Sequence, residues 1–284
     1  THKNKKEKIL NFENNNQLFS IIKNYQLYDI LNKNLYKNKY FKKQITKKKL
    51  IKQEKYNLIV NTEYNNVFTK KYFSKKIEKA YNSFAYTTVI NHEKIANQIA
   101  VQIFTKIGPL AFLPLSKNKT SIVYSIYNSK HIDRKKIIHL INQHNIKYKI
   151  KKIEKIEKFE LKSFNLRSYY HKNILAFGEL THKIHPLAGQ GFNMTIRDIK
   201  ILLEIIQNKI DLGLPINSSV NQEFQKNTRH RNFIFSNGID FIYEFFNHES
   251  KTKNNLLLNS LKYIGSRSSI NNMLKKIADT GLNY

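Results

Sequence analysis

The 284-residue sequence contains no cysteine, and it has only eight glycines and four prolines. Without cysteine the chain has no disulfide framework, no thiolate metal site and no thiol nucleophile. The scarcity of glycine and proline argues against a flexible hinge between domains, and the chain has neither an internal repeat nor a low-complexity linker. A chain of this length can bury a substantial core, so we expect one large domain or two ordinary ones.

Acidic residues are also few, with 20 Asp and Glu against 50 Lys and Arg, which gives a formal net charge of +30. Such a charge is typical of proteins that bind nucleic acid or an anionic membrane surface. Only six of the basic residues are Arg, whereas bidentate recognition of phosphate or guanine prefers Arg to Lys. Lys, Asn and Ile are abundant together, as in proteins from AT-rich genomes. We therefore consider nucleic acid an improbable partner, and we retain peripheral contact with an anionic membrane as an expectation.

Long apolar runs are absent as well. No run approaches the ~18 residues of a membrane-spanning helix, and the first residues, THKNKKEK, lack the apolar stretch of a signal peptide. The expectation is a soluble or peripheral protein of the cytoplasm, in contact with the inner face of the membrane.

The segment 173–200 is the most informative part of the chain. Residues 174–177 form a short continuous apolar run, which is typical of a strand covered on both faces in a parallel sheet. Pro186, Gly189 and Gly191 then predict a turn whose backbone can approach a ligand. An amphipathic helix follows, and its N-terminus can stabilise negative charge. Its predicted buried face consists of Ile199, Leu202, Leu203 and Ile206.

Elsewhere the patterns are coarser. Residues 13–30 carry a helical pattern, and residues 47–61 predict two short strands, the second at 56–60. Alternating apolar residues between 80 and 153 predict an antiparallel sheet with one covered face. From residue 221 the pattern is helical to the end of the chain.

Four separated motifs, in order along the chain, resemble those of one family. Gly178-Glu179, the run from His185 to Asn193 and Arg197-Asp198 resemble the second flavin-binding motif of the FAD-dependent aromatic hydroxylases of ubiquinone biosynthesis, of the 2-polyprenylphenol or 2-polyprenyl-6-methoxyphenol hydroxylase type. Residues 104–115 resemble the family's substrate-domain signature, and Glu13-Asn14 with Leu18 resemble the start of its middle helix. The family's C-terminal helices are matched by residues 223–225, Asp240, 245–246 and 278–282.

The resemblance implies an α+β fold, in which an incomplete α/β-type FAD domain carries an inserted antiparallel β-sheet substrate domain and is followed by C-terminal helices. The expected divisions are 1–79 for the middle part of the FAD domain, 80–160 for the substrate domain, 161–212 for the second flavin-binding motif, and 213–284 for the helical region.

The resemblance also implies FAD as cofactor and NAD(P)H as reductant. In such an enzyme the backbone N–H groups of residues 191–193 stabilise negative charge on the reduced flavin, Pro186 and Leu187 lie beside its reacting face, and Glu179 binds the ribityl hydroxyls. We can name no catalytic side chain, and we expect no metal because His182 and His185 lack a third ligand. The residues expected to bind the cofactor are Gly178, Glu179, Pro186, Leu187, Ala188, Gly189, Gln190, Gly191, Phe192, Asn193 and Glu63.

The sequence departs from the family pattern in three places. It contains no G-x-G-x-x-G turn, which in the family holds the FAD pyrophosphate at the start of a βαβ unit. Glu179 stands where the family has Asp, and the run from Asn61 to Tyr64 stands where it has Gly-Ala-Asp-Gly. We therefore expect a fragment or a divergent copy of the enzyme, with the chain starting downstream of the βαβ unit.

The expected function is hydroxylation of the aromatic ring of a polyprenylated phenol by a flavin-dependent monooxygenase in ubiquinone biosynthesis. One alternative is a non-catalytic structural member of a quinone-biosynthesis complex, which the missing βαβ unit and the altered turn at Glu63 favour. Other quinone-biosynthesis proteins are then the expected partners. A second alternative, a basic nucleic-acid-binding protein, rests on charge alone.

Overall fold

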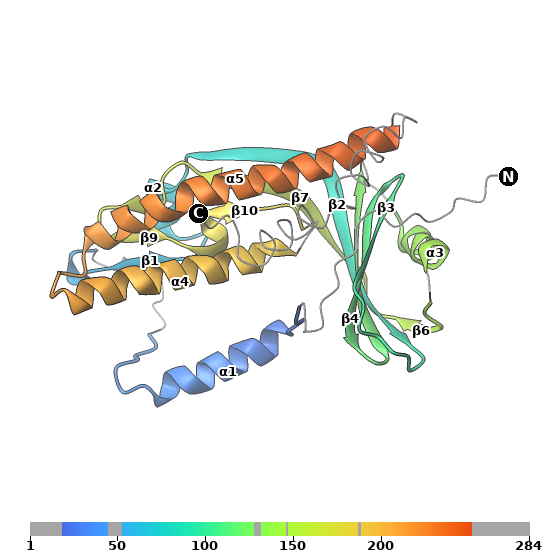
Figure 1. The fold of residues 1–284 in the computed structure, drawn as a ribbon, viewed down its shortest axis with the longest axis horizontal. Coiled ribbons are helices and arrows are strands. Elements are labelled where there is room, and N and C mark those ends of the chain that lie inside the picture. The colour runs from blue at the N-terminus through green and yellow to red at the C-terminus, as the bar shows by residue number, and fades with distance from the viewer. Residues whose placement is uncertain (1–18, 45–52, 128–131, 146, 187–188, 252–284) are drawn as a thin grey trace, which may run out of the picture. The chain divides into compact units, whose positions relative to one another are not determined.

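The computed structural model describes residues 19–44, 53–127, 132–145, 147–186 and 189–251 (Figure 1). The chain divides into two compact units, of which the smaller comprises residues 12–51. This unit contains helix α1 (Asn24–Lys37), none of whose side chains is buried. The helical pattern predicted from residue 13 lies partly outside the described residues, and in the described part the helix begins at Asn24.

The larger unit contains the remaining elements. Its helices are η1 (Gln53–Lys55), α2 (Val67–Tyr72), α3 (Arg134–His144), η2 (Gly178–Leu180), α4 (Gln190–Asp211) and α5 (Ser218–Lys251), where η denotes a 3-10 helix. Its strands are β1 (Ile59–Asn61), β2 (Lys76–His92), β3 (Val101–Thr105), β4 (Gly108–Ser116), β5 (Lys119–Tyr127), β6 (Ile150–Ile153), β7 (Glu157–Leu166), β8 (Tyr170–His171), β9 (Ile174–Ala176) and β10 (His182–Lys183). This mixture confirms the predicted α+β class, whereas the predicted domain boundaries stay predictions.

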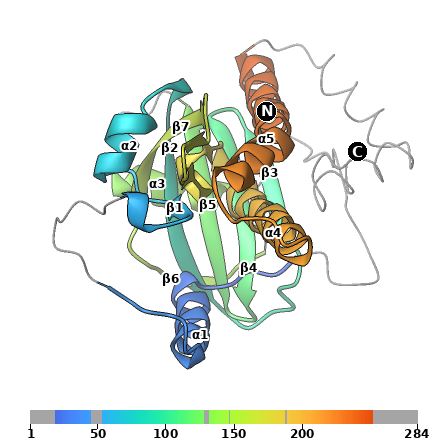
Figure 2. The same ribbon diagram turned by 90° about the vertical axis from the view of Figure 1, so that its left-hand side faces the viewer.

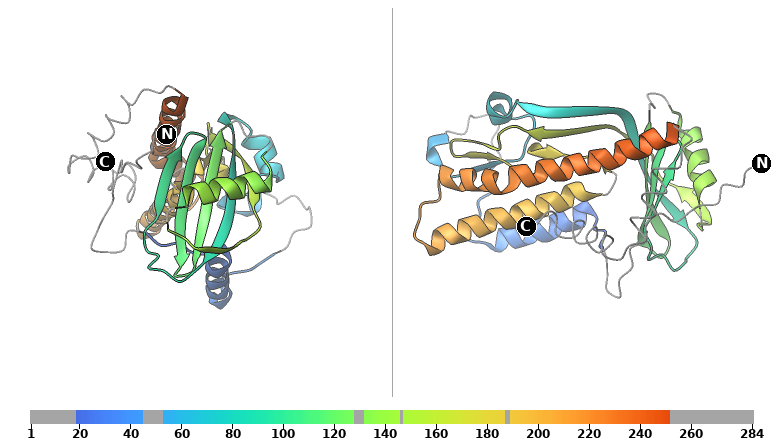
Figure 3. Two further views of the ribbon diagram at one scale, coloured as in Figure 1. Left: turned by 90° about the vertical axis from the view of Figure 1, so that its right-hand side faces the viewer. Right: turned by 45° about the horizontal axis from the view of Figure 1, so that its top comes forward.

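The larger sheet is antiparallel, in the order β10-β7-β2-β5-β4-β3, with β6 paired to β2. Large side chains fill one face, where Ile122 and Tyr124 pack with Ile137 and Ile141 of α3. Figure 3 shows α3 crossing this face of the strands. The alternation predicted for β5 is therefore confirmed, because its even-numbered residues are all buried and Ile122, Tyr124 and Ile126 belong to the core with α3.

The opposite face of this sheet carries smaller side chains, among them Pro109 and Ala111 on β4 and Val123 and Ser125 on β5. Since side chains alternate between faces along a strand, these odd-numbered residues point away from α3. We call this surface the open face of the large sheet.

The smaller sheet has the order β1-β9-β8. Strands β1 and β9 are parallel, with Ile59 opposite Ile174, and every residue of β9 is fully buried. This confirms the predicted strand with two covered faces.

One of the two strands predicted between residues 47 and 61 is wrong in its described part. Residues 53–55 form η1, because the Asn173 side chain donates to the Gln53 and Tyr56 carbonyls at 3.0 and 2.6 Å and holds them in a turn. The second strand is shorter than predicted and occupies only Ile59–Asn61.

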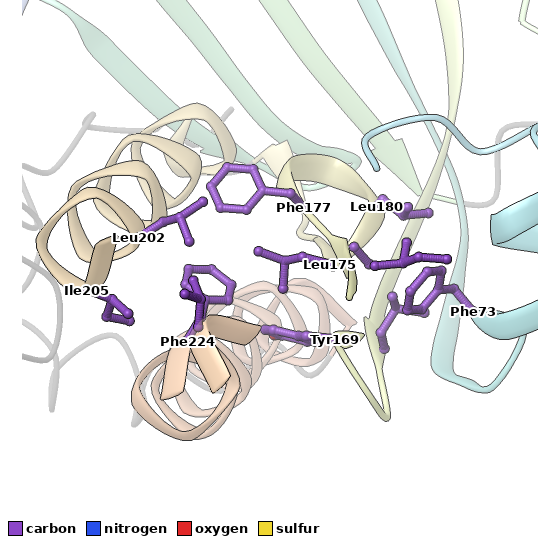
Figure 4. Packing of buried hydrophobic residues seen from close by; sticks show 12 residues of the cluster. Phe73, Tyr169, Leu175, Phe177, Leu180, Leu202, Ile205 and Phe224 are labelled. Carbon is purple, nitrogen blue, oxygen red and sulfur yellow. The ribbon is translucent and has the colours of Figure 1, made fainter. Parts of the chain in front are cut away.

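Helices α4 and α5 run side by side and cover the smaller sheet (Figures 1 and 2). Figure 4 shows Leu175 and Phe177 of the sheet segment directed toward Leu202 of α4 and Phe224 of α5. Burial of each such side chain contributes about 1.5–3 kcal/mol. The small sheet is thus stabilised by helices that follow it in the chain.

The buried face of α4 differs from the predicted one. It consists of Met194, Asp198, Leu202 and Ile205, whereas Ile199 is 39% and Leu203 is 59% exposed. The reason is that α4 carries apolar residues on two sides, and the predicted stripe straddled both. We call the second, exposed set the outer stripe of α4; it comprises Phe192, Ile196, Ile199, Leu203 and Ile210.

Candidate functional site

The N-terminus of α4 lies where the sequence predicts it. Gly189 is the residue before the first turn, and its φ of 61° places it in the left-handed region that glycine adopts without strain. No side chain caps the helix, so the N–H groups of its first turn are left for a ligand, at the positive end of the helix dipole. Among its first residues, the Asn193 side chain donates to the Gln190 side chain at 3.2 Å and the Thr195 hydroxyl donates to the Gly191 carbonyl oxygen at 3.4 Å.

A second turn lies against α4. Gly178 follows β9 with a φ of 65°, and a Cβ atom added there would lie 3.8 Å from the Thr195 side chain of α4. Glu179 is exposed, and within the part of the chain that the structure describes its carboxylate takes part in no ion pair or hydrogen bond. Its carboxylate is therefore accessible to a ligand beside the helix.

The loop after β1 meets this turn. The Tyr64 hydroxyl donates a hydrogen bond to the Glu179 carbonyl oxygen, and the Tyr64 ring packs edge-on against Phe164 at 5.9 Å between centroids. Burial, with the negative charge of Glu179 as a lesser cause, raises the pKa of Tyr64 above its usual range, which keeps the phenol protonated as the donor. Glu63, next to Tyr64, is exposed. The two sites where the sequence departs from the family pattern are thus in contact.

The two histidines of the motif, His182 and His185, make different contacts. His182 is buried, and its Nε2 lies 2.9 Å from Asp198 Oδ2; the Asn232 side chain donates to both oxygens of the same carboxylate at 3.1 and 3.2 Å. Sequence reasoning missed this arrangement, although His182 and Asp198 both lie within the motif. The described residues contain no group of three His, Cys, Asp or Glu that could hold a metal ion.

His185 is fully buried between two tyrosines. Its ring meets Tyr243 at 4.1 Å and Tyr81 at 5.0 Å, the latter edge-on. Burial lowers the pKa of His185 to about 3, so the imidazole is neutral near pH 7. It joins the segment that precedes α4 to β2 and to α5, which positions the following residue, Pro186.

Pro186 faces the open face of the large sheet across a small pocket. The other lining residues come from three neighbouring strands and are Gln102, Pro109, Ala111, Val123 and Ser125. Gly108 lets β4 approach β5 closely here, because a Cβ atom at that position would lie 1.9 Å from the Ser125 carbonyl oxygen.

The structure therefore brings most of the predicted residues to one region. The turn at Gly178-Glu179 contacts both the Tyr64 loop and α4, and Pro186 lies before the start of α4. Leu187 and Ala188 lie outside the described residues. Phe192 belongs to the outer stripe and is 55% exposed.

Comparison with solved structures defines the class of fold. The p-nitrophenol 4-monooxygenase PnpA from Pseudomonas putida DLL-E4 superposes with a TM-score of 0.66 at 11% identity, over 80% of this chain and 60% of that chain. HpxO from Klebsiella pneumoniae, solved with FAD and uric acid, superposes with a TM-score of 0.60 at 9% identity, over 79% and 59%. The chain has the fold of the FAD-dependent aromatic hydroxylases.

Sequence relatives narrow this class. The 3-demethoxyubiquinol 3-hydroxylase of Escherichia coli K12 is 31% identical over 156 residues, which are 51% of this chain and 39% of that protein. The mitochondrial ubiquinone biosynthesis monooxygenase COQ6 of Dictyostelium discoideum is 26% identical over 122 residues, which are 43% and 23%. The chain is related to the hydroxylases of ubiquinone biosynthesis, which confirms the resemblance seen in its motifs.

The alignments cover two fifths or less of the length of these curated relatives. No model of a known protein family matches the sequence. In the part of the chain that the structure describes, no helix is both long enough and apolar enough to span a bilayer.

Proposed function

We propose that this protein is an FAD-dependent monooxygenase of ubiquinone biosynthesis that hydroxylates the ring of a polyprenylated phenol, with NAD(P)H as reductant and O2 as oxidant. The observation that carries the proposal is the placement of Pro186. This residue precedes the uncapped N-terminus of α4 and also lines the pocket on the open face of the large sheet. A flavin held at α4 would therefore meet a ring held on the sheet.

The residues present fit FAD. A Cβ atom added at Gly189 would have no neighbour within 4 Å, and one added at Gly191 would meet only Ile184, at 3.8 Å. The backbone at this turn is thus open to a flat ring. Glu179 would accept hydrogen bonds from the ribityl hydroxyls, and the N–H groups of residues 191–193 would stabilise negative charge on the flavin.

Bound FAD would supply the transfer of one oxygen atom from O2 to the ring. The protein's own residues would orient the two partners and exclude water. His185 would fix Pro186 through its contacts with Tyr81 and Tyr243, and its low pKa keeps it from adding a positive charge near the flavin.

The cofactor requires a further binding element, because the sequence contains no G-x-G-x-x-G turn for the pyrophosphate. Strand β1 pairs with β9 on one side, and no described strand pairs with its other side, which leaves an edge for a βαβ unit. We expect the 284-residue chain by itself to bind FAD weakly or not at all, and a family-like βαβ unit to restore binding.

Flavin fluorescence titration tests this expectation. Tight binding by the 284 residues alone would contradict it. In the restored protein, Gly191→Val should abolish binding, because a branched side chain would stand where the backbone meets the flavin. The space around Gly191 allows the fold to accept the substitution, so a thermal unfolding midpoint close to that of the parent is the control.

The reaction is tested with isotope-labelled O2. The restored protein should oxidise NAD(P)H faster when a polyprenylphenol is present, and mass spectrometry should find one labelled oxygen atom in the ring. If flavin binds and no prenylphenol or methoxyphenol acquires the label, the structural alternative replaces the hydroxylase. That alternative has one observation in its favour: Tyr64, which replaces a family glycine, covers the Glu179 turn.

Membrane contact is a further part of the proposal. A polyprenylated substrate resides in the bilayer, and the +30 charge would favour an anionic surface by ~1 kcal/mol for each well-placed Lys or Arg. Binding to anionic vesicles should therefore fall with added salt. Equal binding to neutral vesicles would exclude charge as the cause, and a strong preference for RNA over lipid would support the nucleic-acid alternative.

A further inference from the structure

Helix α1 has an apolar side that stays exposed in the part of the chain that the structure describes. None of its side chains is buried, and Tyr28, Leu31 and Leu35 are 59%, 54% and 45% exposed. These three residues lie at i, i+3 and i+7, so they share one side of the helix. We call this side the α1 face. A contiguous exposed apolar surface marks a site of contact with a protein or a membrane.

The remainder of this segment is strongly basic. Residues 19–44 contain six lysines and a single acidic residue, Asp29. Two of the lysines, Lys33 and Lys37, lie on the side of α1 opposite the α1 face, because they are about half a helical turn away from it. A helix with apolar residues on one side and lysines on the other is the type that lies in the interface of a membrane.

Tyrosines lie at the border between the two sides of α1. Lys23 Nζ lies 5.8 Å from the centre of the Tyr25 ring, and Lys43 Nζ lies 6.0 Å from the centre of the Tyr36 ring. Each pair places an ammonium group beside a ring that is apolar in its body and polar at its hydroxyl. This combination suits the headgroup layer of a bilayer, where tyrosine is enriched and where lysine meets anionic lipids.

The charge of the segment discriminates among the surfaces that would cover the α1 face. A second copy of the chain would bring six more lysines close to the first six, and like charges repel. Nucleic acid would neutralise the lysines and leave the apolar side chains in water. An anionic bilayer satisfies both sides of the helix, because the acyl region accepts the apolar residues and the headgroups neutralise the lysines.

We propose that α1 is a membrane-docking helix, which lies in the interface of an anionic phospholipid bilayer with Tyr28, Leu31 and Leu35 inserted. The inference deepens the proposed function by naming the element that makes the membrane contact, and it rests on that function only for the need to reach a polyprenylated substrate. Insertion adds an apolar component to the attraction between charges. Part of the binding should therefore persist at a salt concentration that screens the lysines.

The first test is cosedimentation of the full 284-residue chain with vesicles of phosphatidylcholine and phosphatidylglycerol. Leu31→Glu should weaken binding about tenfold, because it removes an inserted side chain and brings a carboxylate to an anionic surface. Leu203→Glu on α4 is the matched control, since Leu203 is a similarly exposed leucine and the added charge is the same. It should change binding by less than about twofold.

Equal losses in Leu31→Glu and Leu203→Glu would overturn the proposal, because they would leave only a general effect of net charge. Complete loss of binding at high salt would also overturn it, since insertion of the α1 face would then contribute nothing.

The second test uses the absence of tryptophan from the sequence, so that a single introduced tryptophan is the only one. Tyr28→Trp places this probe on the α1 face, and Gln26→Trp places it on the side of Lys33 and Lys37. On addition of the same vesicles, the emission of Tyr28→Trp should shift to shorter wavelength and be quenched by brominated acyl chains. The emission of Gln26→Trp should change little, and equal responses of the two variants would overturn the proposal.

The same probe identifies other occupants of the α1 face. Emission of Tyr28→Trp at short wavelength in buffer alone would mean that another segment of the chain covers this face. A shift without vesicles that increases with protein concentration would assign the face to a second copy. Either outcome would overturn the proposal.

Failure of the proposed function gives a different result. Vesicle binding that depends on Leu31, in a flavin-loaded protein that transfers no labelled oxygen, would keep the docking helix and remove the monooxygenase. Labelled oxygen transfer by a protein whose vesicle binding is unchanged by Leu31→Glu would keep the monooxygenase and remove the docking helix.

Discussion

The two sheets of this protein differ in how they are stabilised. The large antiparallel sheet has strands of up to 17 residues and forms a core with α3, its own neighbour in sequence. The small sheet has strands of two or three residues and depends on α4 and α5 for its cover. The candidate cofactor residues lie on and around the small sheet. The proposed flavin contacts thus lie in the region with the less autonomous core, whereas the pocket beside Pro186 is lined by strands of the large sheet.

The largest expected effect comes from breaking the large sheet. Gly108→Val would place a Cβ atom 1.9 Å from the Ser125 carbonyl oxygen, at a φ of 138° that side chains rarely adopt. Backbone strain and overpacking together should destabilise the chain by about 5 kcal/mol. Urea unfolding measures the loss.

Gly238→Ala on α5 is the control for Gly108→Val, because no atom lies within 4 Å of its added Cβ. It should stabilise the chain by about 0.4–1 kcal/mol. If Gly108→Val unfolds at the same urea midpoint as the parent, the large sheet accommodates the added side chain at this position. The large sheet would then not be the more rigid of the two sheets.

The second largest effect is expected from a substitution in α4, one of the two helices that cover the small sheet. Asp198→Ala would leave His182 and Asn232 without their buried acceptor, at an expected cost of about 3–4 kcal/mol. Hydrogen exchange should rise mainly in residues 174–182 and α4, and remain low in β4 and β5. Uniform loss of protection in both sheets would show that they unfold as one unit.

A smaller effect is expected where the two regions meet. The pKa of His185 is lowered by burial from 6.5 to about 3. Above pH 6.5 the imidazole is neutral in both the folded and the unfolded chain. As the pH falls from 6.5 toward 3, the unfolded chain gains a proton that the folded chain does not, so stability falls.

Between pH 7 and pH 4.5 this group should therefore lower the free energy of unfolding by about 2–3 kcal/mol. His185→Phe keeps an aromatic ring between Tyr81 and Tyr243 and should make that pH-dependent loss correspondingly smaller. The same loss in both proteins would mean that His185 is hydrated or partnered in its charged form.

The smallest effect concerns Tyr64. Tyr64→Phe removes the hydrogen bond to the Glu179 carbonyl and keeps the packing on Phe164, so it should cost about 0.5–1.5 kcal/mol. In the protein with a restored βαβ unit, Tyr64→Gly should raise FAD affinity if the tyrosine narrows the site. Lower affinity in Tyr64→Gly would instead make Tyr64 a support for the Glu179 turn.

Local patterns predicted the elements whose burial is decided by neighbours in sequence. The alternation at Ile122, Tyr124 and Ile126 predicted a strand because it has the period of two of a half-covered strand. The run 174–177 predicted the strand at Ile174–Ala176 because it is too short for a helix and is followed by turn residues. The helix start at Gly189 followed from the turn chemistry. These features were enough to locate most of the candidate site.

Long-range contacts decided the rest. The turn at 53–55 is held by Asn173, which lies 120 positions further along the chain, and no local pattern signals such a partner. The buried face of α4 includes a charged residue, Asp198, whose burial depends on His182 and Asn232. Gln102 and Ser125 were missed because they meet the predicted residue Pro186 only when β3, β5 and the segment before α4 are assembled.

The outer stripe of α4 has a practical consequence for anyone who isolates this protein. Five large apolar side chains at i, i+4, i+7, i+11 and i+18 face solvent on one helix, and a contiguous patch of this kind promotes self-association. Light scattering of the purified chain should increase with concentration, and Leu203→Glu, which removes no buried contact, should keep it dispersed. A difference in light scattering between the two proteins would then show that the outer stripe of α4 is uncovered in solution.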